Sequence, residues 1–190
     1  MDITGWIILG IIVLVLLYAV SVYNKLVRLR ALVREGFSGI TVQLRRRADL
    51  IPNLVEAVKG YASHEREVLD DVTAHRSDAV KAASVEGTAL ADARMTGLLG
   101  RLMAVAEAYP DLKANENFLD LQQQLAAIET ELQGARRYYN ATVRDLNSTV
   151  QRFPDMLVAR PAGFSEESFY QDADESIQSA PQVSFARPAA

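Results

Sequence analysis

Apolar residues follow two different patterns along this chain, and the change between them lies near residue 24. Between Ile3 and Asn24 there is no charged residue, and most positions are apolar. A run of this length is sufficient to cross the hydrocarbon core of a bilayer as a helix. Trp6 and Tyr23 lie near its two ends, where amphipathic rings favour the headgroup level. We therefore predict a transmembrane anchor over residues 1–24.

A cleaved signal peptide is the alternative interpretation of this run. Signal peptides begin with basic residues, whereas the only charged side chain before the run is that of Asp2. Ala19 and Ser21 resemble a cleavage site, but the apolar run continues through them into a helical pattern. We therefore favour a retained anchor.

Beyond the anchor, apolar residues recur at steps of three and four, which is typical of amphipathic helices. The pattern predicts a mainly α fold, in which an elongated antiparallel (up-down) helical bundle over residues 25–154 follows a single transmembrane helix. The last bundle helix has the most regular pattern, from Phe118 to Phe153, and would be roughly 55–60 Å long. It needs an antiparallel partner of similar length, which the first part of the bundle can supply. Four bundle helices are predicted, over residues 25–48, 50–82, 88–109 and 113–153.

The boundaries between these helices rest on a few breaking residues. Pro52 predicts a new helix with Asp49 as its N-cap, and the alternative is a kink within one continuous helix. Gly87 lies in a stretch that reads as a loop over residues 84–88. Pro110 is expected to end the third helix, because the residue before a proline is pushed out of the helical region.

The composition changes after Pro154, where prolines, serines, glutamines and acidic residues replace the helical pattern. We expect residues 155–190 to form an extended or partly disordered tail. Its few apolar residues could dock on the bundle or on another subunit, and a loosely attached, solvated tail is the alternative. These candidate docking residues are Phe164, Phe169, Tyr170, Val183 and Phe185.

Basic residues gather directly after the anchor, although the chain carries a net charge of −4. We call Lys25, Arg28, Arg30 and Arg34 the collar, and such a collar suits anionic lipid headgroups. The alternatives are ordinary solvation and the setting of membrane topology. By the positive-inside rule, the collar and the bulk of the chain are predicted on the cytoplasmic side.

Cysteine and histidine, which serve many enzymes as catalytic residues and metal ligands, are scarce in this chain. The chain has no cysteine and two histidines, His64 and His75, eleven positions apart. His64 and Glu65 begin like H-E-x-x-H, but Val68 replaces the second histidine, so the zinc motif fails. There is also no phosphate-binding glycine loop and no serine-nucleophile motif. We predict no catalytic residue, no metal ligand and no cofactor, and therefore no enzymatic activity.

Nucleic-acid binding is not expected either. The chain is acidic overall, and its aromatic residues are not interleaved with basic ones. Asn53, Lys59, Tyr61, Asn115, Asn117 and Asn140 are instead candidates for polar links between helices, because a buried polar group must be hydrogen-bonded.

Two stretches of the chain resemble the LemA family. They are QLRRRADLIPNLVEAVKGYASHE, over residues 43–65, and PDLKANENFLDLQQQL followed by ARRYYNATVRDLNSTVQRFP, over residues 110–154. The tail pieces GF and PQVSF come in the matching order, and the stretch GFSGI at residues 36–40 departs locally from the pattern. The resemblance implies a bacterial membrane protein with an antiparallel helical bundle and without an agreed biochemical activity. It supplies no catalytic residue to carry over.

Two functions follow as hypotheses. The first is a non-enzymatic structural or scaffolding protein that self-assembles into a homo-oligomer at the bacterial cytoplasmic membrane. The second is a membrane-tethered adaptor for another membrane protein, for example a quality-control protease or a signalling enzyme. In both, the lipid bilayer is a partner.

Overall fold

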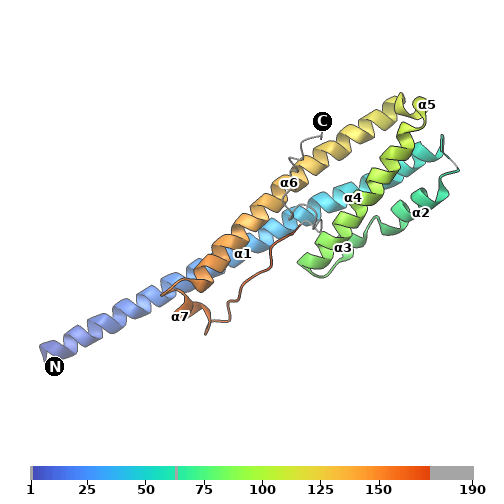
Figure 1. The fold of residues 1–190 in the computed structure, drawn as a ribbon. Helices are drawn as coiled ribbons and strands as arrows, with labels where there is room; N and C mark the ends of the chain where they lie inside the picture. Colours follow the sequence, from blue (N-terminus) through green and yellow to red (C-terminus); the bar gives the residue numbers. More distant parts are fainter. Residues whose placement is uncertain (1, 63, 172–190) are drawn as a thin grey trace, which may run out of the picture.

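The computed structural model describes residues 2–62 and 64–171 of the chain. Over these ranges it contains helices and no strand, so the prediction of a mainly α fold is confirmed. Figure 1 shows an elongated molecule in which one long helix runs through a bundle and projects from one end of it.

The projecting helix is α1 (Ile3–Lys59), which has 57 residues. At 1.5 Å per residue it is about 85 Å long. Its N-terminal part lies outside the bundle in Figure 1, and it holds a window of 18 residues that is apolar enough to cross a membrane and is not buried by the rest of the chain. From Val22 onwards α1 buries one stripe of side chains. The same helix is therefore both the candidate membrane span and the backbone of the bundle.

The predicted helix boundary near Pro52 is wrong, because Pro52 lies inside α1 and Asp49 is not an N-cap. Proline removes one backbone hydrogen bond and is normally costly within a helix. Here the buried stripe continues through it without a change of register, at Leu44, Ile51 and Leu54. Ending the helix would break this stripe, so tertiary packing outweighs the local cost.

Helix α6 (Glu116–Gln151) is the antiparallel partner of α1 (Figure 1). The two helices approach closely at Gly36, where an added Cβ would lie 3.1 Å from the Cα of Tyr139. Gly36 is buried, and a larger side chain has no space there. The glycine within GFSGI therefore permits the close crossing of the two helices.

The second predicted helix, over 50–82, is also wrong. The chain turns after Lys59 and continues as α2 (Arg66–His75) and α3 (Asp78–Lys81), which fold back beside α4 (Val85–Glu107) (Figure 1). A long straight helix would carry the apolar side chains Leu69 and Val72 away from the bundle, whereas the turn buries both of them.

Two side-chain caps set helix starts that differ from the predicted ones. Ser84 accepts a hydrogen bond from the backbone N–H of Gly87, so the predicted loop over 84–88 is mostly the first turn of α4. Asn115 accepts a hydrogen bond from the N–H of Phe118 and starts α6 three residues later than predicted. Between them, α5 (Pro110–Lys113) begins with Pro110, which is favourable at the first helical position.

The interior is divided into two apolar clusters along the length of the bundle. The cluster near the projecting part of α1 is called the proximal core, and the other is called the distal core. The largest fully buried side chains of the proximal core are Leu26, Ile40, Leu132, Tyr139 and Leu146. Those of the distal core are Ile51, Leu54, Leu102, Leu112 and Phe118.

The tail is more ordered than predicted over its first part. A short helix, α7 (Met156–Ala159), follows α6, and residues 163–171 then run back along the proximal half of the bundle in Figure 1. We call residues 163–171 the strap. An extended backbone was predicted for it and is present, but the strap is attached by the specific contacts described below.

Candidate functional site

The strap is attached to α6 by the side-chain amides of two asparagines. Asn147 donates to the carbonyl oxygen of Glu167 and accepts from its N–H, both at 2.9 Å. Asn140 makes the same pair with Tyr170, at 3.0 and 2.8 Å. Each asparagine amide therefore makes the pair of hydrogen bonds that an adjacent β-strand would make. Both the N–H and the carbonyl of its partner residue are hydrogen-bonded.

The spacing of these contacts follows from backbone geometry. Asn140 and Asn147 are two helical turns apart, which is about 10.5 Å along α6. Glu167 and Tyr170 are three residues apart in an extended segment, which is about 10 Å. The two repeats match, so an extended segment antiparallel to α6 brings both of its residues into register with the asparagines.

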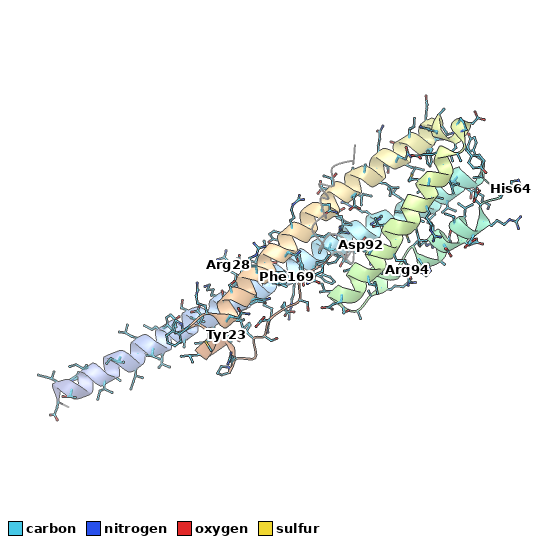
Figure 2. The ribbon with its side chains drawn as sticks, in the orientation of Figure 1. Tyr23, Arg28, His64, Asp92, Arg94 and Phe169 are labelled. Atoms are coloured by element: carbon cyan, nitrogen blue, oxygen red, sulfur yellow. The ribbon has the colours of Figure 1, made fainter. Side chains whose placement is uncertain are left out.

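The strap ends at a buried ionic cluster centred on Asp92, which is only 1 % exposed. Arg47 of α1 donates to Asp92 Oδ1 at 2.8 Å, and Tyr170 of the strap donates to Oδ2 at 2.7 Å. Arg136 of α6 also donates to Oδ2. One carboxylate of α4 therefore binds three other parts of the chain. Figure 2 shows Asp92 at mid-length of the bundle.

A second carboxylate lies near both guanidinium groups of this cluster. Glu129 lies 3.6 Å from Arg47 and 3.9 Å from Arg136, so two carboxylates face two guanidinium groups. The second guanidinium nitrogen of Arg47 donates to Thr96 at 2.9 Å. A buried charge is tolerated only when it is paired and hydrogen-bonded, and Asp92 meets both conditions.

The part of the chain that the structure describes leaves no room for a substrate at the ionic cluster. The cavity beside Asp92 and Arg47 has a volume of about 10 Å³, which admits at most a single water molecule. A general acid or base must reach a reacting group, and Asp92 is enclosed by its own ligands. We interpret the cluster as a structural lock that joins α1, α4, α6 and the strap.

Two tyrosines of this region have perturbed acidities. Burial raises the pKa of Tyr139 to about 12, and the charges of Glu167 and Glu86 act in the same direction. Burial also raises the pKa of Tyr170, and the neighbouring Asp92 carboxylate adds to the effect. Both phenols are therefore neutral hydrogen-bond donors at ordinary pH: Tyr139 donates to the carbonyl of Ser168 at 2.8 Å.

The four residues of the predicted collar have different environments in the structure. Arg30 lies over the ring of Phe164 at 4.1 Å and donates to the carbonyl of Gly163 at 3.0 Å, so it holds the start of the strap. Lys25 lies 3.8 Å from Asp155 and remains partly exposed. Arg28, labelled in Figure 2, and Arg34 are exposed. Their use by lipid headgroups stays a prediction.

A groove of about 300 Å³ lies between α1 and the start of the strap, close to the candidate membrane span. It combines two guanidinium groups with an apolar floor. The residues that line it are Tyr23, Val27, Arg30, Ala31, Arg34, Ala162 and Phe164. Tyr23 and Phe164 also stack edge to face, with ring centroids 5.9 Å apart. This arrangement suits an anionic headgroup, because it offers two guanidinium groups beside apolar side chains and no carboxylate among its lining residues.

The candidate docking residues of the tail have different environments. Phe164 and Tyr170 are buried against the bundle of their own chain, and Phe169, labelled in Figure 2, is partly exposed. Val183 and Phe185 lie outside the described residues. Docking on the bundle is thus observed for two of the five, and docking on another subunit stays a prediction.

The two histidines lie in different local structures. His64 lies in the turn before α2, whereas His75 ends α2 and contacts Asp78 at 2.7 Å. Across residues 2–62 and 64–171, no group of three or more potential metal-ligating side chains comes together.

Several residues of the site were missed from the sequence. Arg47 and Asp92 each occupy a position on the buried stripe of their helix, and a charge on such a stripe is a signal that could have identified them. Among the residues singled out as polar links, Asn115 does join Tyr61, at 3.2 Å, and Asn140 binds the strap.

Comparison with known proteins identifies a family and several relatives. The model of the LemA family matches residues 36–185. Protein LemA of Metamycoplasma hominis is 26 % identical, in an alignment that covers 80 % of this chain and 69 % of the relative. Magnetosome protein MamQ 2 of Paramagnetospirillum magneticum is 25 % identical, with 79 % of this chain and 65 % of the relative covered. Magnetosome protein MamQ of Magnetospirillum gryphiswaldense is 24 % identical over the same shares. The chain thus spans about two thirds of the length of these relatives.

The family match extends over most of the chain and includes the bundle and the strap. The chain therefore belongs to the LemA family.

Proposed function

We propose that this LemA-family chain is a non-enzymatic, membrane-anchored scaffold that self-assembles at the bacterial cytoplasmic membrane. The observation that carries the proposal is the continuity of α1, which supplies the candidate membrane span and the main helix of the bundle. A helix without a hinge fixes the direction of the bundle relative to the span, whereas a flexible linker would not.

The polar residues of the site support a structural role. Asp92, Arg47 and the two strap asparagines all bind other parts of the chain. Two shallow grooves of about 300 and 260 Å³ lie along α1 near the strap, and no histidine lines either of them. Relatives named magnetosome proteins are consistent with work at a membrane, without defining the task of this chain.

Self-assembly is supported by the apolar surface of the span. Its side chains face outward all around α1, and within the described residues no other helix of this chain passes the same length and hydropathy test for a membrane span. Lipid or the spans of further copies must cover this surface.

We further propose that the bundle lies on the cytoplasmic side. Lys25, Arg28 and Arg34 directly follow the span and remain at least partly exposed, which is the charge distribution of the positive-inside rule. A membrane-impermeant thiol reagent tests this with Leu90→Cys on the bundle, since the chain has no cysteine of its own. Labelling only after the cells are opened supports the cytoplasmic side, and labelling of intact spheroplasts contradicts it.

The decisive experiment for assembly is the native mass of the full-length protein in mild detergent, measured over a dilution series. A discrete mass of several copies supports the scaffold. A monomer at every concentration contradicts it and favours the adaptor, whose membrane-protein partner would then be sought by crosslinking.

Single cysteines show whether any assembly exists before extraction. Leu14→Cys lies on the span and Leu90→Cys lies on the bundle, with similar exposed fractions of 67 % and 63 %. A disulfide-linked dimer in membranes at either position supports assembly and identifies the contacting part. If neither position crosslinks and the extracted mass is monomeric, the scaffold proposal is rejected.

A further inference from the structure

The end of the bundle nearest the span presents two large apolar side chains to the outside. Phe153 follows α6 and Leu157 lies in α7, and they are 72 % and 62 % exposed. We call residues 152–160 the tip. In Figure 1 the tip lies at the end of the bundle from which the N-terminal part of α1 projects.

The tip contacts α1 within the apolar span, and not only at the charged residues that follow it. The hydroxyl of Tyr18 donates to Asp155, and Lys25 lies 3.8 Å from the same carboxylate. Tyr18 is seven residues before Lys25, which is about 10 Å along the helix axis. The tip therefore lies alongside the last two turns of the uncharged stretch of α1.

The uncharged stretch of α1 is only slightly longer than the hydrocarbon core of a bilayer, so almost all of it is needed to cross the membrane. The uncharged segment between Asp2 and Lys25 is roughly 33 Å long as a helix. The hydrocarbon core of a bilayer is about 30 Å thick. With charges at both ends of the segment held at the interfaces, Tyr18 lies at or below the headgroup level, and the tip beside it reaches the same depth.

The polar groups of the tip are compatible with that depth. Asp155 is 5 % exposed and receives hydrogen bonds from Tyr18 and from Arg152, the latter at 2.8 Å. These hydrogen bonds and the positive charges of Arg152 and Lys25 hold the pKa of Asp155 below its usual value. Arg152 and Arg160 are exposed and can extend toward phosphates.

We propose that the tip is a second membrane contact, in which Phe153 and Leu157 insert into the lipid interface beside α1. The occupant is the bilayer, because Asp155 of the tip is hydrogen-bonded to Tyr18, which lies within the exposed apolar span of α1. An amphipathic surface with apolar side chains and flanking cations is the type that lies in the interfacial plane. Contact at two points fixes the tilt of the bundle, which a single span does not.

This inference rests on the membrane insertion of α1 and not on self-assembly. Three leucines allow a matched test: Leu14 on the span, Leu157 on the tip and Leu90 on α4, which are 67 %, 62 % and 63 % exposed. Each is replaced by a single cysteine and labelled with bimane in the full-length protein. The proteins are reconstituted at low protein-to-lipid ratio into vesicles of equal parts phosphatidylcholine and phosphatidylglycerol. Quenching is measured with iodide and with phosphatidylcholine brominated near the headgroup.

The expected result is that brominated lipid quenches the labels at Leu14 and Leu157, while the label at Leu90 is unaffected. Iodide should quench the Leu157 label at least about threefold less than the Leu90 label, as for an interfacial residue. Phe153→Cys provides a second reporter and should behave as Leu157→Cys does.

Two results would overturn the proposal. If brominated lipid quenches Leu14 but iodide reaches Leu157 and Leu90 equally, α1 is inserted and the tip is in water. If Leu157 is protected from iodide without quenching by brominated lipid, the tip is covered by a second copy of the chain. In either case the native-mass experiment stands independently, so the failure of this inference is distinct from the failure of the scaffold proposal.

Discussion

The proximal and distal halves of the bundle enclose their apolar cores with different elements. In the distal half, α2, α4 and α5 lie against α1 and α6, and the core between them is closed by apolar side chains of helices. In the proximal half only α1 and α6 run side by side over most of the length, and two helices cannot enclose a core. The strap, together with α7, supplies the missing layer.

The comparison shows why the strap depends on polar bonds. A helix satisfies its own backbone groups, whereas an extended segment must find partners elsewhere. Asn140 and Asn147 supply those partners, and Phe164 and Tyr170 supply the apolar cover. The distal half therefore depends mainly on apolar burial, and the proximal half depends on both burial and specific hydrogen bonds.

The Asp92 cluster lies where the two halves meet. Arg47 separates Leu44 of the proximal core from Ile51 of the distal core, and Asp92 separates Ala89 from Met95 in the same way. An ionic lock at this position links the two halves, because Arg47 and Asp92 each lie between a proximal-core residue and a distal-core residue of the same helix.

Breaking this lock should have the largest effect. Asp92→Ala removes the carboxylate closest to two largely buried guanidinium groups, while the more exposed Glu129 stays 3.6 Å from Arg47 and 3.9 Å from Arg136. We expect a loss of about 3 kcal/mol in the free energy of unfolding, at the lower end for a broken buried ion pair. Urea denaturation of the full-length protein in mild detergent, followed by circular dichroism, measures this.

The matched control is Asp71→Ala, which removes an exposed ion pair with Arg101 at 3.1 Å. It should cost only about 0–1 kcal/mol. Equal losses in the two variants would show that the Asp92 cluster does not couple the halves.

Removing an asparagine should loosen the proximal half alone. Asn147→Ala leaves both backbone groups of Glu167 without their partner, at a cost of about 1–3 kcal/mol. Hydrogen exchange should rise in the strap and remain unchanged in α4. Asn53→Ala, at an exposed position of α1, is the control and should alter neither region. Faster exchange in α4 would show that Asn147 supports more of the bundle than the strap.

Two glycines of α1 test the close contact of the proximal half. A Cβ at Gly36 would lie 3.1 Å from the backbone of Tyr139, whereas at Gly39 the nearest atom is 3.9 Å away. Gly39→Ala should stabilise by up to about 1 kcal/mol, because alanine has the higher helix propensity. Gly36→Ala should lose this gain and cost about 1 kcal/mol in net stability, because the helices must separate. The same denaturation series measures both, and an equal gain in both variants would exclude a close contact at Gly36.

Alkaline pH should weaken the strap by a smaller amount. In the folded state the pKa of the Tyr139 phenol is about 12, whereas a free tyrosine has a pKa of about 10. The folded state therefore favours the neutral phenol. This contribution to stability is complete below pH of about 10 and is lost as the pH rises toward about 12. The mobility of a spin label at Phe169→Cys, followed together with phenolate absorbance, should increase in that window. Adding Tyr139→Phe should remove this increase, and an increase that persists would assign it to another group.

Periodicity in the sequence predicted the parts of the fold that depend on it. The long regular patterns of α1 and α6 identified both helices and their antiparallel pairing, because burial of a continuous stripe determines them. Pro52 was misread, since a local breaker was given more weight than the unbroken stripe on either side of it. The turn after Lys59 was missed because it is set by the packing of Leu69 and Val72, which no local residue reveals.

The candidate site was less predictable. Phe164 and Tyr170 were identified as docking residues, and Asn140 was identified as a polar link. Their partners are far away in the sequence: Tyr170 and Asp92 are 78 positions apart. The matched repeats of Asn140 with Asn147 and of Glu167 with Tyr170 become visible only after the strap is known to be extended and antiparallel to α6.

The central claim is that one uninterrupted helix connects the membrane to the far end of the bundle. The most direct measurement is the distance between spin labels at Val27→Cys and Glu56→Cys in the full-length protein in lipid vesicles, by pulsed electron resonance. Both positions are exposed, on either side of Pro52. A continuous helix predicts a narrow distribution near about 44 Å between the two backbone positions. A broad or clearly shorter distribution would mean that α1 bends or breaks at Pro52, and the rigid scaffold would be contradicted.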